Sequence, residues 1–191
     1  MKKIEIISSL LGDVALPLVG FLFWDWGFYF IALFFLFDLI FRTFFLKKRL
    51  SPLQEMRGRN KILFYSFLFS FIEVLMIHFI VIGAFPSMNV GDAFIDFLSY
   101  EELGIAQGVV LLPLLFLNEW MRIRNENKIA VPHPTRIQII YNSQWVQRCR
   151  LILWLAMGLA VLFLSVNELV LIITFFLFFI AQPFLVFRNV N

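Results

Sequence analysis

The sequence predicts an all-α integral membrane protein with six transmembrane helices and both termini in the cytoplasm. Two features of the composition predict the membrane: 61% of the 191 residues are hydrophobic and only 15% are charged, whereas soluble domains have about 25% charged residues. A soluble globule could not cover so much apolar surface. The distribution of lysine and arginine along the chain predicts the orientation.

Six apolar segments each approach the ~20 residues needed to cross about 30 Å of hydrocarbon. They cover residues 6–24, 27–46, 62–85, 104–121, 151–166 and 169–187. Backbone groups cannot stay unpaired in lipid, and the segments lack the alternation of barrel strands, so each one is expected to be a helix. Residues 1–191 then form a single transmembrane domain.

The first segment begins like a secretory signal, but Asp13 interrupts its apolar run and no small-x-small cleavage site follows. We therefore expect a retained helix. Only Asp25 and Trp26 separate it from the second segment, and only Asn167 and Glu168 separate the fifth from the sixth. Connections this short force antiparallel hairpins.

Two longer connections have recognisable content. Residues 91–103 place Phe94 and Phe97 on one face at helical spacing, which predicts a short helix on the membrane surface. Residues 130–145 begin with two prolines and continue with an apolar stretch too short to span. We expect this second connection to dip to the interface or to pack under the bundle.

Phenylalanine is concentrated in the second and sixth segments. We expect these two helices to face lipid or an oligomer partner. The first, third and fourth segments are then expected to be more interior.

Orientation follows from the basic residues outside the spans, which all fall on one side. They are Lys2, Lys3, Lys47, Lys48, Arg49, Arg57, Arg59, Lys61, Arg122, Arg124, Lys128, Arg136, Arg148, Arg150 and Arg188. The opposite side has no lysine or arginine and carries Asp25, Asp92, Asp96, Glu101, Glu102 and Glu168. The positive-inside rule places the basic side in the cytoplasm, where it would contact anionic lipids rather than nucleic acid.

Charged residues also occur inside the predicted spans. In the stretch FDLIFRTFF, Asp38 and Arg42 stand four residues apart with the acid first, so they share a helix face and are expected to pair. A charge at the bilayer centre costs about 2.5 to 3.5 kcal/mol, so such residues are expected to face the protein interior. The tight turn between the first two segments places Asp13 almost level with Asp38, and Glu73 falls near mid-membrane.

These positions predict a polar cluster of Asp13, Asp38, Arg42 and Glu73, the candidate ion or proton site. Possible accessory residues share the same helices. They are Ser9, one turn before Asp13; Ser70, on the stripe of Glu73; and His78, further out on the same helix. Three acids face one base, so the surplus carboxylates are protonated or are neutralised by a cation or a partner base.

Two functional hypotheses follow. In the first, Glu73 and Asp13 exchange protons, Arg42 sets their affinity, and the protein is a small proton- or cation-coupled transporter or channel component. In the alternative, the network only fixes helix packing, and the protein is a noncatalytic structural or accessory membrane protein that binds another membrane protein. A homo-oligomer is compatible with either hypothesis.

Evidence for an enzyme is lacking, although the sequence leaves that class open. It contains no Walker loop, paired-histidine zinc motif, nucleophile elbow or dinucleotide fingerprint. The single cysteine, Cys149, excludes an intrachain disulfide and a cysteine-based metal site. We therefore expect no cofactor and no metal.

Several stretches resemble a known family. They are ALPLVGFLFWDWG with the following aromatic helix that contains Asp38, IHFIVIGAF with His78, and HPTRIQIIYN. They resemble a family of small multi-pass bacterial membrane proteins known only as a domain of unknown function. The family tends to have aromatic-x-Glu-Asn where this chain has Phe37-Asp38-Leu39. The resemblance implies the multi-pass architecture and the bacterial inner (cytoplasmic) membrane, but no activity.

Overall fold

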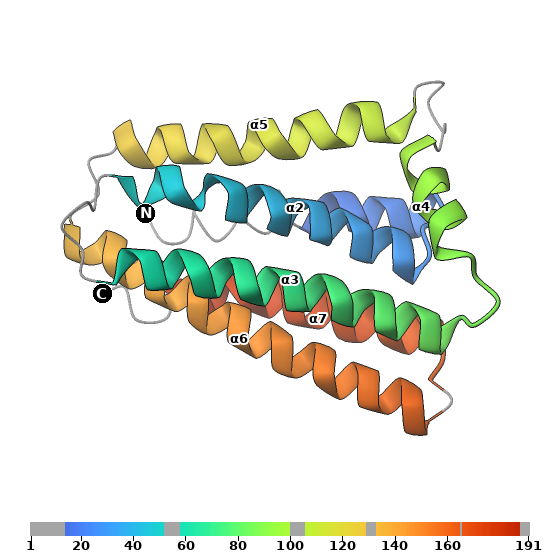
Figure 1. Cartoon of the computed structure of the whole chain (residues 1–191). Coiled ribbons are helices and arrows are strands. Elements are labelled where there is room, and N and C mark those ends of the chain that lie inside the picture. The colour runs from blue at the N-terminus through green and yellow to red at the C-terminus, as the bar shows by residue number, and fades with distance from the viewer. Residues whose placement is uncertain (1–13, 52–57, 100–105, 129–132, 165, 188–191) are drawn as a thin grey trace.

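The computed structural model describes residues 14–51, 58–99, 106–128, 133–164 and 166–187. All regular secondary structure in these residues is helical, as predicted. A first helix, Val14–Phe23, is followed by α2 (Phe28–Arg49), α3 (Arg59–Ala84), α4 (Val90–Ser99), α5 (Gln107–Lys128), α6 (His133–Phe163) and α7 (Glu168–Phe187). The long helices run side by side along the molecule, and α4 lies across one end (Figure 1).

Three described helices are long and apolar enough to cross a membrane: α2, α3 and the part Ile140–Phe163 of α6. Val14–Phe23 and Glu168–Gln182 are also apolar, but shorter. These lengths and compositions indicate a membrane protein. Six crossings and the cytoplasmic location of both termini remain predictions.

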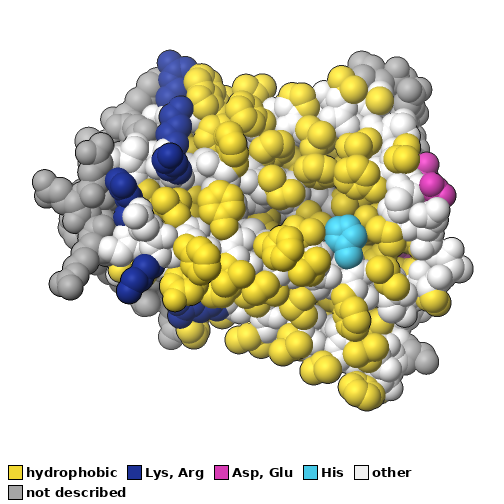
Figure 2. Space-filling model, viewed as in Figure 1, with side chains coloured by type: hydrophobic (Ala, Val, Ile, Leu, Met, Phe, Trp, Pro, Cys, Tyr) yellow, Lys and Arg dark blue, Asp and Glu magenta, His cyan; other side chains and the backbone are white. Residues whose placement is uncertain are grey.

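The two ends of the bundle differ in charge. We call the end where α2 stops at Arg49 and α3 begins at Arg59 the basic end, and the end that carries α4 the acidic end. On the face that Figure 2 shows, lysine and arginine side chains gather at the basic end and acidic side chains at the acidic end. Hydrophobic side chains cover most of the surface between them.

Helix α2 is the centre of the bundle and contacts α3, α4, α5 and α7. Its ring of Phe35 lies 4.8 Å from that of Phe175 and 3.8 Å from that of Phe179, both on α7. On another face, the ring of Phe45 lies 4.9 Å from that of Phe116 on α5. Aromatic pairs at these distances add to the stability that burial provides.

The expectation that α2 faces lipid and α3 lies inside is therefore wrong. Of the apolar, membrane-length stretch of each helix, 61% is buried in α2 and only 28% in α3. In α7, Phe175 is completely buried. A helix that is apolar all round gives no sign of which face is inward, because lipid and protein interior accept the same side chains.

The predicted short helix is present as α4, but its aromatic face packs onto the bundle. Phe97 is 1% exposed. Its ring lies 5.5 to 6.3 Å from the rings of Trp26, Phe30 and Phe37. Helix α4 thus closes the acidic end of the bundle with the face that was expected to meet lipid.

Helix α6 differs most from the expected segment 151–166, because it is continuous from His133 to Phe163. The connection expected at 130–145 is therefore helical from His133 onward. Pro134 stands at the second helical position, in the first turn, where a missing N–H has no helical partner to lose. Proline here is compatible with the start of a helix.

Glu168 joins two helices at the acidic end. Its Oε1 accepts a hydrogen bond of 2.7 Å from the backbone N–H of Phe28, the first residue of α2. Gly27, the N-cap of α2, has no side chain to make this bond itself. The first turn of α7 is capped separately, because Asn167 Oδ1 accepts from the N–H of Leu169 at 2.9 Å.

The contact of Gly20 with Trp26 makes a packing prediction. A Cβ at Gly20 would overlap the Trp26 ring, and that ring is 1% exposed and has little room to move. Gly20→Ala is expected to destabilise the protein by about 1 to 3 kcal/mol. Thermal unfolding of the purified protein in detergent would measure the change.

Gly158→Ala is the matched control, because its added Cβ would find its nearest neighbour, Ile80 Cγ1, at an ordinary 3.7 Å. Alanine is also the better helix former, so this variant is expected to be as stable as the parent or more so. Equal losses from both variants would contradict the packing described for Trp26.

Candidate functional site: a buried polar seam between α3 and α6

Polar side chains line the interface between α3 and α6. On α6, Gln144, Gln147 and Arg150 recur every three residues; on α3, Ser66, Ser70 and Glu73 recur at spacings of four and three. Such spacings keep each set on one helix face. Hydrogen bonds and an ion pair join the two sets, and we call these six residues the polar seam.

The innermost members of the seam form an ion pair. Arg150 Nε lies 3.0 Å from Glu73 Oε2, and Arg150 Nη2 donates to Glu73 Oε1 at 3.1 Å. Glu73 is 2% exposed and Arg150 7%. A hydrogen bond between two ionised groups is shorter and stronger than one between neutral groups. Each charge therefore has its counter-charge in place.

Gln147 and Trp154 flank Arg150 on α6, three residues before it and four residues after it. All three side chains therefore lie on one face of α6.

The hydroxyl of Ser70, one turn from Glu73 towards the basic end, takes part in three hydrogen bonds. It donates to the backbone oxygen of Ser66 at 2.8 Å. A hydroxyl has one proton, so Ser70 Oγ accepts from its two other neighbours, Thr43 Oγ1 at 2.8 Å and Gln147 Nε2 at 3.1 Å. Thr43 belongs to α2, and this bond ties the seam to the centre of the bundle.

Nearer the basic end, the seam uses backbone acceptors of α3. Gln147 Nε2 also donates to the backbone oxygen of Ser66 at 3.3 Å, and Gln144 Nε2 donates to that of Ile62 at 3.4 Å. Ile62 is in the first turn of α3. The seam therefore extends from the basic end inward to Glu73.

Towards the acidic end, the same interface becomes apolar. Ile77 and Ile80 on α3 and Trp154 on α6 are each at most 1% exposed. Further out the helices approach closely, since a Cβ at Gly83 would lie 3.0 Å from Val161 Cγ1. Polar groups therefore line the α3–α6 interface from the basic end to Glu73. Between Glu73 and the acidic end, the interface is apolar.

The predicted pair of Asp38 and Arg42 is present, with Arg42 Nε 2.7 Å from Asp38 Oδ2. Asp38 shares its face of α2 with Phe45, seven residues later, which packs on α5. Thr43, which contacts the seam, is five residues or about 140° away from Asp38. The pair and the seam therefore occupy different faces of α2.

The predicted site residues are thus distributed as follows. Glu73 and Ser70 lie in the seam, and Asp38 pairs with Arg42. Asp13 and Ser9 lie outside the described residues, so the cluster expected from Asp13, Asp38, Arg42 and Glu73 remains a prediction.

His78 lies beyond the seam, beside α2. Its Nδ1 is 2.8 Å from the backbone oxygen of Val74, which can only accept, so Nδ1 carries a proton. Its Nε2 lies 3.4 Å from the hydroxyl of Tyr29 on α2. His78 is half-buried.

Sequence reasoning missed Arg150. It was assigned to a cytoplasmic connection with Arg148, whereas the structure places it inside α6 and buried against Glu73. The signal that could have identified it is the three-residue spacing of Gln144, Gln147 and Arg150, which marks one polar face on a helix. The two prolines before this stretch suggested a loop instead.

A second buried carboxylate was also missed. Glu119 on α5 is 3% exposed. Its oxygens lie 4.0 Å from Arg49 Nη1 and 3.5 Å from Arg122 Nη1. This cluster joins the last turn of α2 to α5.

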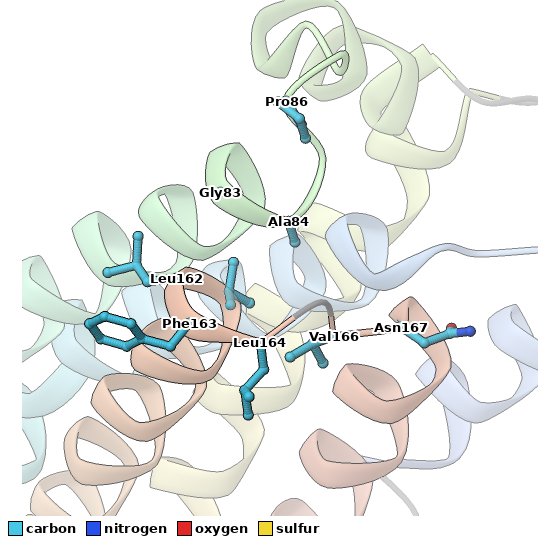
Figure 3. Close-up of a pocket in the computed structure, with 9 residues that line it drawn as sticks. Gly83, Ala84, Pro86, Leu162, Phe163, Leu164, Val166 and Asn167 are labelled. Carbon is cyan, nitrogen blue, oxygen red and sulfur yellow. The ribbon is translucent and has the colours of Figure 1, made fainter.

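A cavity of about 510 Å³ opens at the acidic end between the end of α3 and the turn from α6 to α7 (Figure 3). Gly83, Ala84 and Pro86 line one side. The opposite side is apolar except for Asn167. No titratable side chain lines this cavity, and in the described part of the chain no group of three or more His, Cys, Asp or Glu residues could hold a metal ion.

Comparisons of the chain with family models, with curated proteins and with solved structures gave no match. The family resemblance of the sequence therefore stays a prediction. The functional argument rests on the geometry of the seam.

The Glu73–Arg150 pair predicts non-additive stability changes. Glu73→Leu or Arg150→Met alone would leave one buried charge unpaired, with an expected cost of about 3 to 5 kcal/mol. The double variant removes both charges and is expected to lose much less than the sum of the single losses. Unfolding of all four proteins in the same detergent would measure the coupling.

Asp92→Asn is the control, because Asp92 is exposed and its bond to Asn89 joins two residues of one turn. This change is expected to alter the stability by about 0.5 kcal/mol or less. Losses at Glu73 and Arg150 that simply add would show that the two charges do not depend on each other.

Proposed function

We propose that the chain is a six-span protein of the bacterial inner membrane with both termini in the cytoplasm. The apolar helices α2, α3 and α6 support the membrane location. The separation of exposed basic and acidic side chains to opposite ends supports the orientation (Figure 2), because lysine and arginine are retained on the cytoplasmic side.

Within that membrane, the protein is a noncatalytic structural or accessory protein that binds another membrane protein. The observation that carries this proposal is the buried Glu73–Arg150 pair, in which one guanidinium lies within 3.1 Å of both carboxylate oxygens. The pair is neutral as a unit. An ion-binding carboxylate needs a free acceptor oxygen, whereas a packing contact needs none.

The outward face of α3 is the surface that this proposal assigns to the partner. Phe64, Phe67, Phe71 and Leu75 on it are between 54% and 64% exposed. The seam holds the opposite face of the same helix against α6. A helix fixed in this way presents a rigid aromatic surface, which lowers the entropy lost when a second helix binds.

A small proton- or cation-coupled transporter or channel component is the second candidate. One observation favours it: the polar seam leads from the basic end to Glu73. The apolar barrier of Ile77, Ile80 and Trp154 argues against it, because an ion would also need a route to the acidic end.

Flux measurements separate the two candidates. Purified protein in liposomes is expected to pass neither protons nor potassium ions faster than empty liposomes under an imposed gradient. A flux that Glu73→Gln abolishes would contradict the accessory role. An equal flux from the Glu73→Gln variant would reject only the role of Glu73 in transport.

Photo-crosslinking in the native membrane tests the partner. A photoreactive amino acid in place of Phe71 is expected to give one discrete adduct with another membrane protein. Leu155 is the matched control position, because it is 54% exposed but lies on α6. Absence of an adduct at Phe71, or the same adducts at both positions, would contradict the assignment of this face.

A further inference from the structure

Exposed basic side chains of three helices meet at the basic end. They are Lys47 and Lys48 in the last turn of α2, Lys61 in the first turn of α3, and Arg124 on α5. Among the described side chains, the acid nearest to them on α5, Glu119, is 3% exposed and engaged by Arg49 and Arg122. The charge that the described, exposed side chains present at this end is therefore positive.

These exposed side chains differ from the arginines that form ion pairs within the bundle. Arg150 pairs with Glu73 inside the bundle, and Arg42 pairs with Asp38. Each of these two arginines therefore has a carboxylate beside it. The four exposed groups form none of these buried pairs. On the face that Figure 2 shows, lysine and arginine side chains gather in a band at the edge of the apolar surface.

An aromatic side chain fixes the depth of this band. The guanidinium carbon of Arg124 lies 5.5 Å from the ring centroid of Trp120, one turn earlier on α5. Trp120 is 36% exposed, and Met121 beside it 51%. Tryptophan prefers the headgroup level of a bilayer, so its cation–π contact holds Arg124 at that level.

The last turn of α2 lies beside α5 at this depth. Arg49 reaches Glu119 at 4.0 Å, which aligns the last turn of α2 with the turn of α5 before Trp120. Lys47 and Lys48 belong to that last turn. Basic groups from two helices thus border one stretch of interface next to exposed apolar side chains such as Phe44.

We propose that this end binds anionic phospholipids, with their phosphate headgroups held by Lys47, Lys48 and Arg124. Charge complementarity identifies the headgroup, and the adjoining apolar surface accommodates the acyl chains. The site requires the proposed membrane location, but it is independent of the accessory role and of any ion movement.

Native mass spectrometry of the full chain in detergent tests the site. Dioleoyl-phosphatidylglycerol is expected to bind roughly tenfold more tightly than dioleoyl-phosphatidylcholine, which has the same acyl chains. The preference is expected to weaken as salt rises, because the groups are exposed. Lys47→Gln, Lys48→Gln and Arg124→Gln combined in one variant are expected to abolish it.

Asp92→Asn is the control for net charge, since it makes the protein more positive at the acidic end. It is expected to leave the preference unchanged. Equal binding of both lipids, or a preference retained by the triple variant, would overturn the proposal. Inorganic phosphate that competes as well as the lipid would show a phosphate site instead.

A separate labelling experiment tests the membrane location itself. With Cys149 replaced by serine, Ser87→Cys and Asn60→Cys place one exposed thiol at the acidic or basic end, respectively. An impermeant maleimide added to intact cells is expected to label only the first. The opposite pattern would refute the orientation, whereas failure of the lipid test alone would refute only the headgroup site.

Discussion

The ion pair between Glu73 and Arg150 is the interaction on which the arrangement of α3 and α6 depends. Neither charge would be tolerated alone at this depth, because both side chains are almost completely buried and each would lose its counter-charge. Two contacts of about 3 Å bring both carboxylate oxygens to the guanidinium. They also fix the register, since a shift of one turn would separate the charges by about 5 Å.

The same constraint recurs at other buried carboxylates. Asp38 meets Arg42 within α2, and Glu119 on α5 meets Arg122 on the same helix and Arg49 in the last turn of α2. Each acid is matched by a guanidinium, which can offer several donors in one plane. Apolar packing supplies most of the contact area, but it has little directional preference. The polar contacts therefore define which of many similar apolar faces touch.

The sequence predicted the helical class and the positions of α2 and α3 because hydrocarbon thickness sets helix length and lipid excludes unpaired backbone. It also predicted the Asp38–Arg42 pair, because partners four residues apart depend only on helix geometry. It could not predict the partner of Glu73. That contact joins residues 77 apart, and recognising it requires knowing that α6 is helical before residue 151.

The inward location of α2 was unpredictable for a different reason. Its residues are as apolar on the lipid side as on the protein side, so no periodic pattern marks the buried face. The actual choice depends on the shapes of facing rings, such as Phe35 against Phe179. The proposed accessory role follows from this arrangement: the seam immobilises one face of α3 and leaves the opposite, aromatic face free for a partner.

The most direct measurement is the rate of disulfide formation across α3 and α6. In protein with Cys149 replaced by serine, Gly83→Cys with Val161→Cys would place two thiols at the point of closest approach, where a Cβ at residue 83 lies 3.0 Å from Val161 Cγ1. The account predicts rapid cross-linking when Glu73 is intact and much slower cross-linking after Glu73→Ala. Equal rates in both backgrounds would contradict the claim that this ion pair holds the two helices in register.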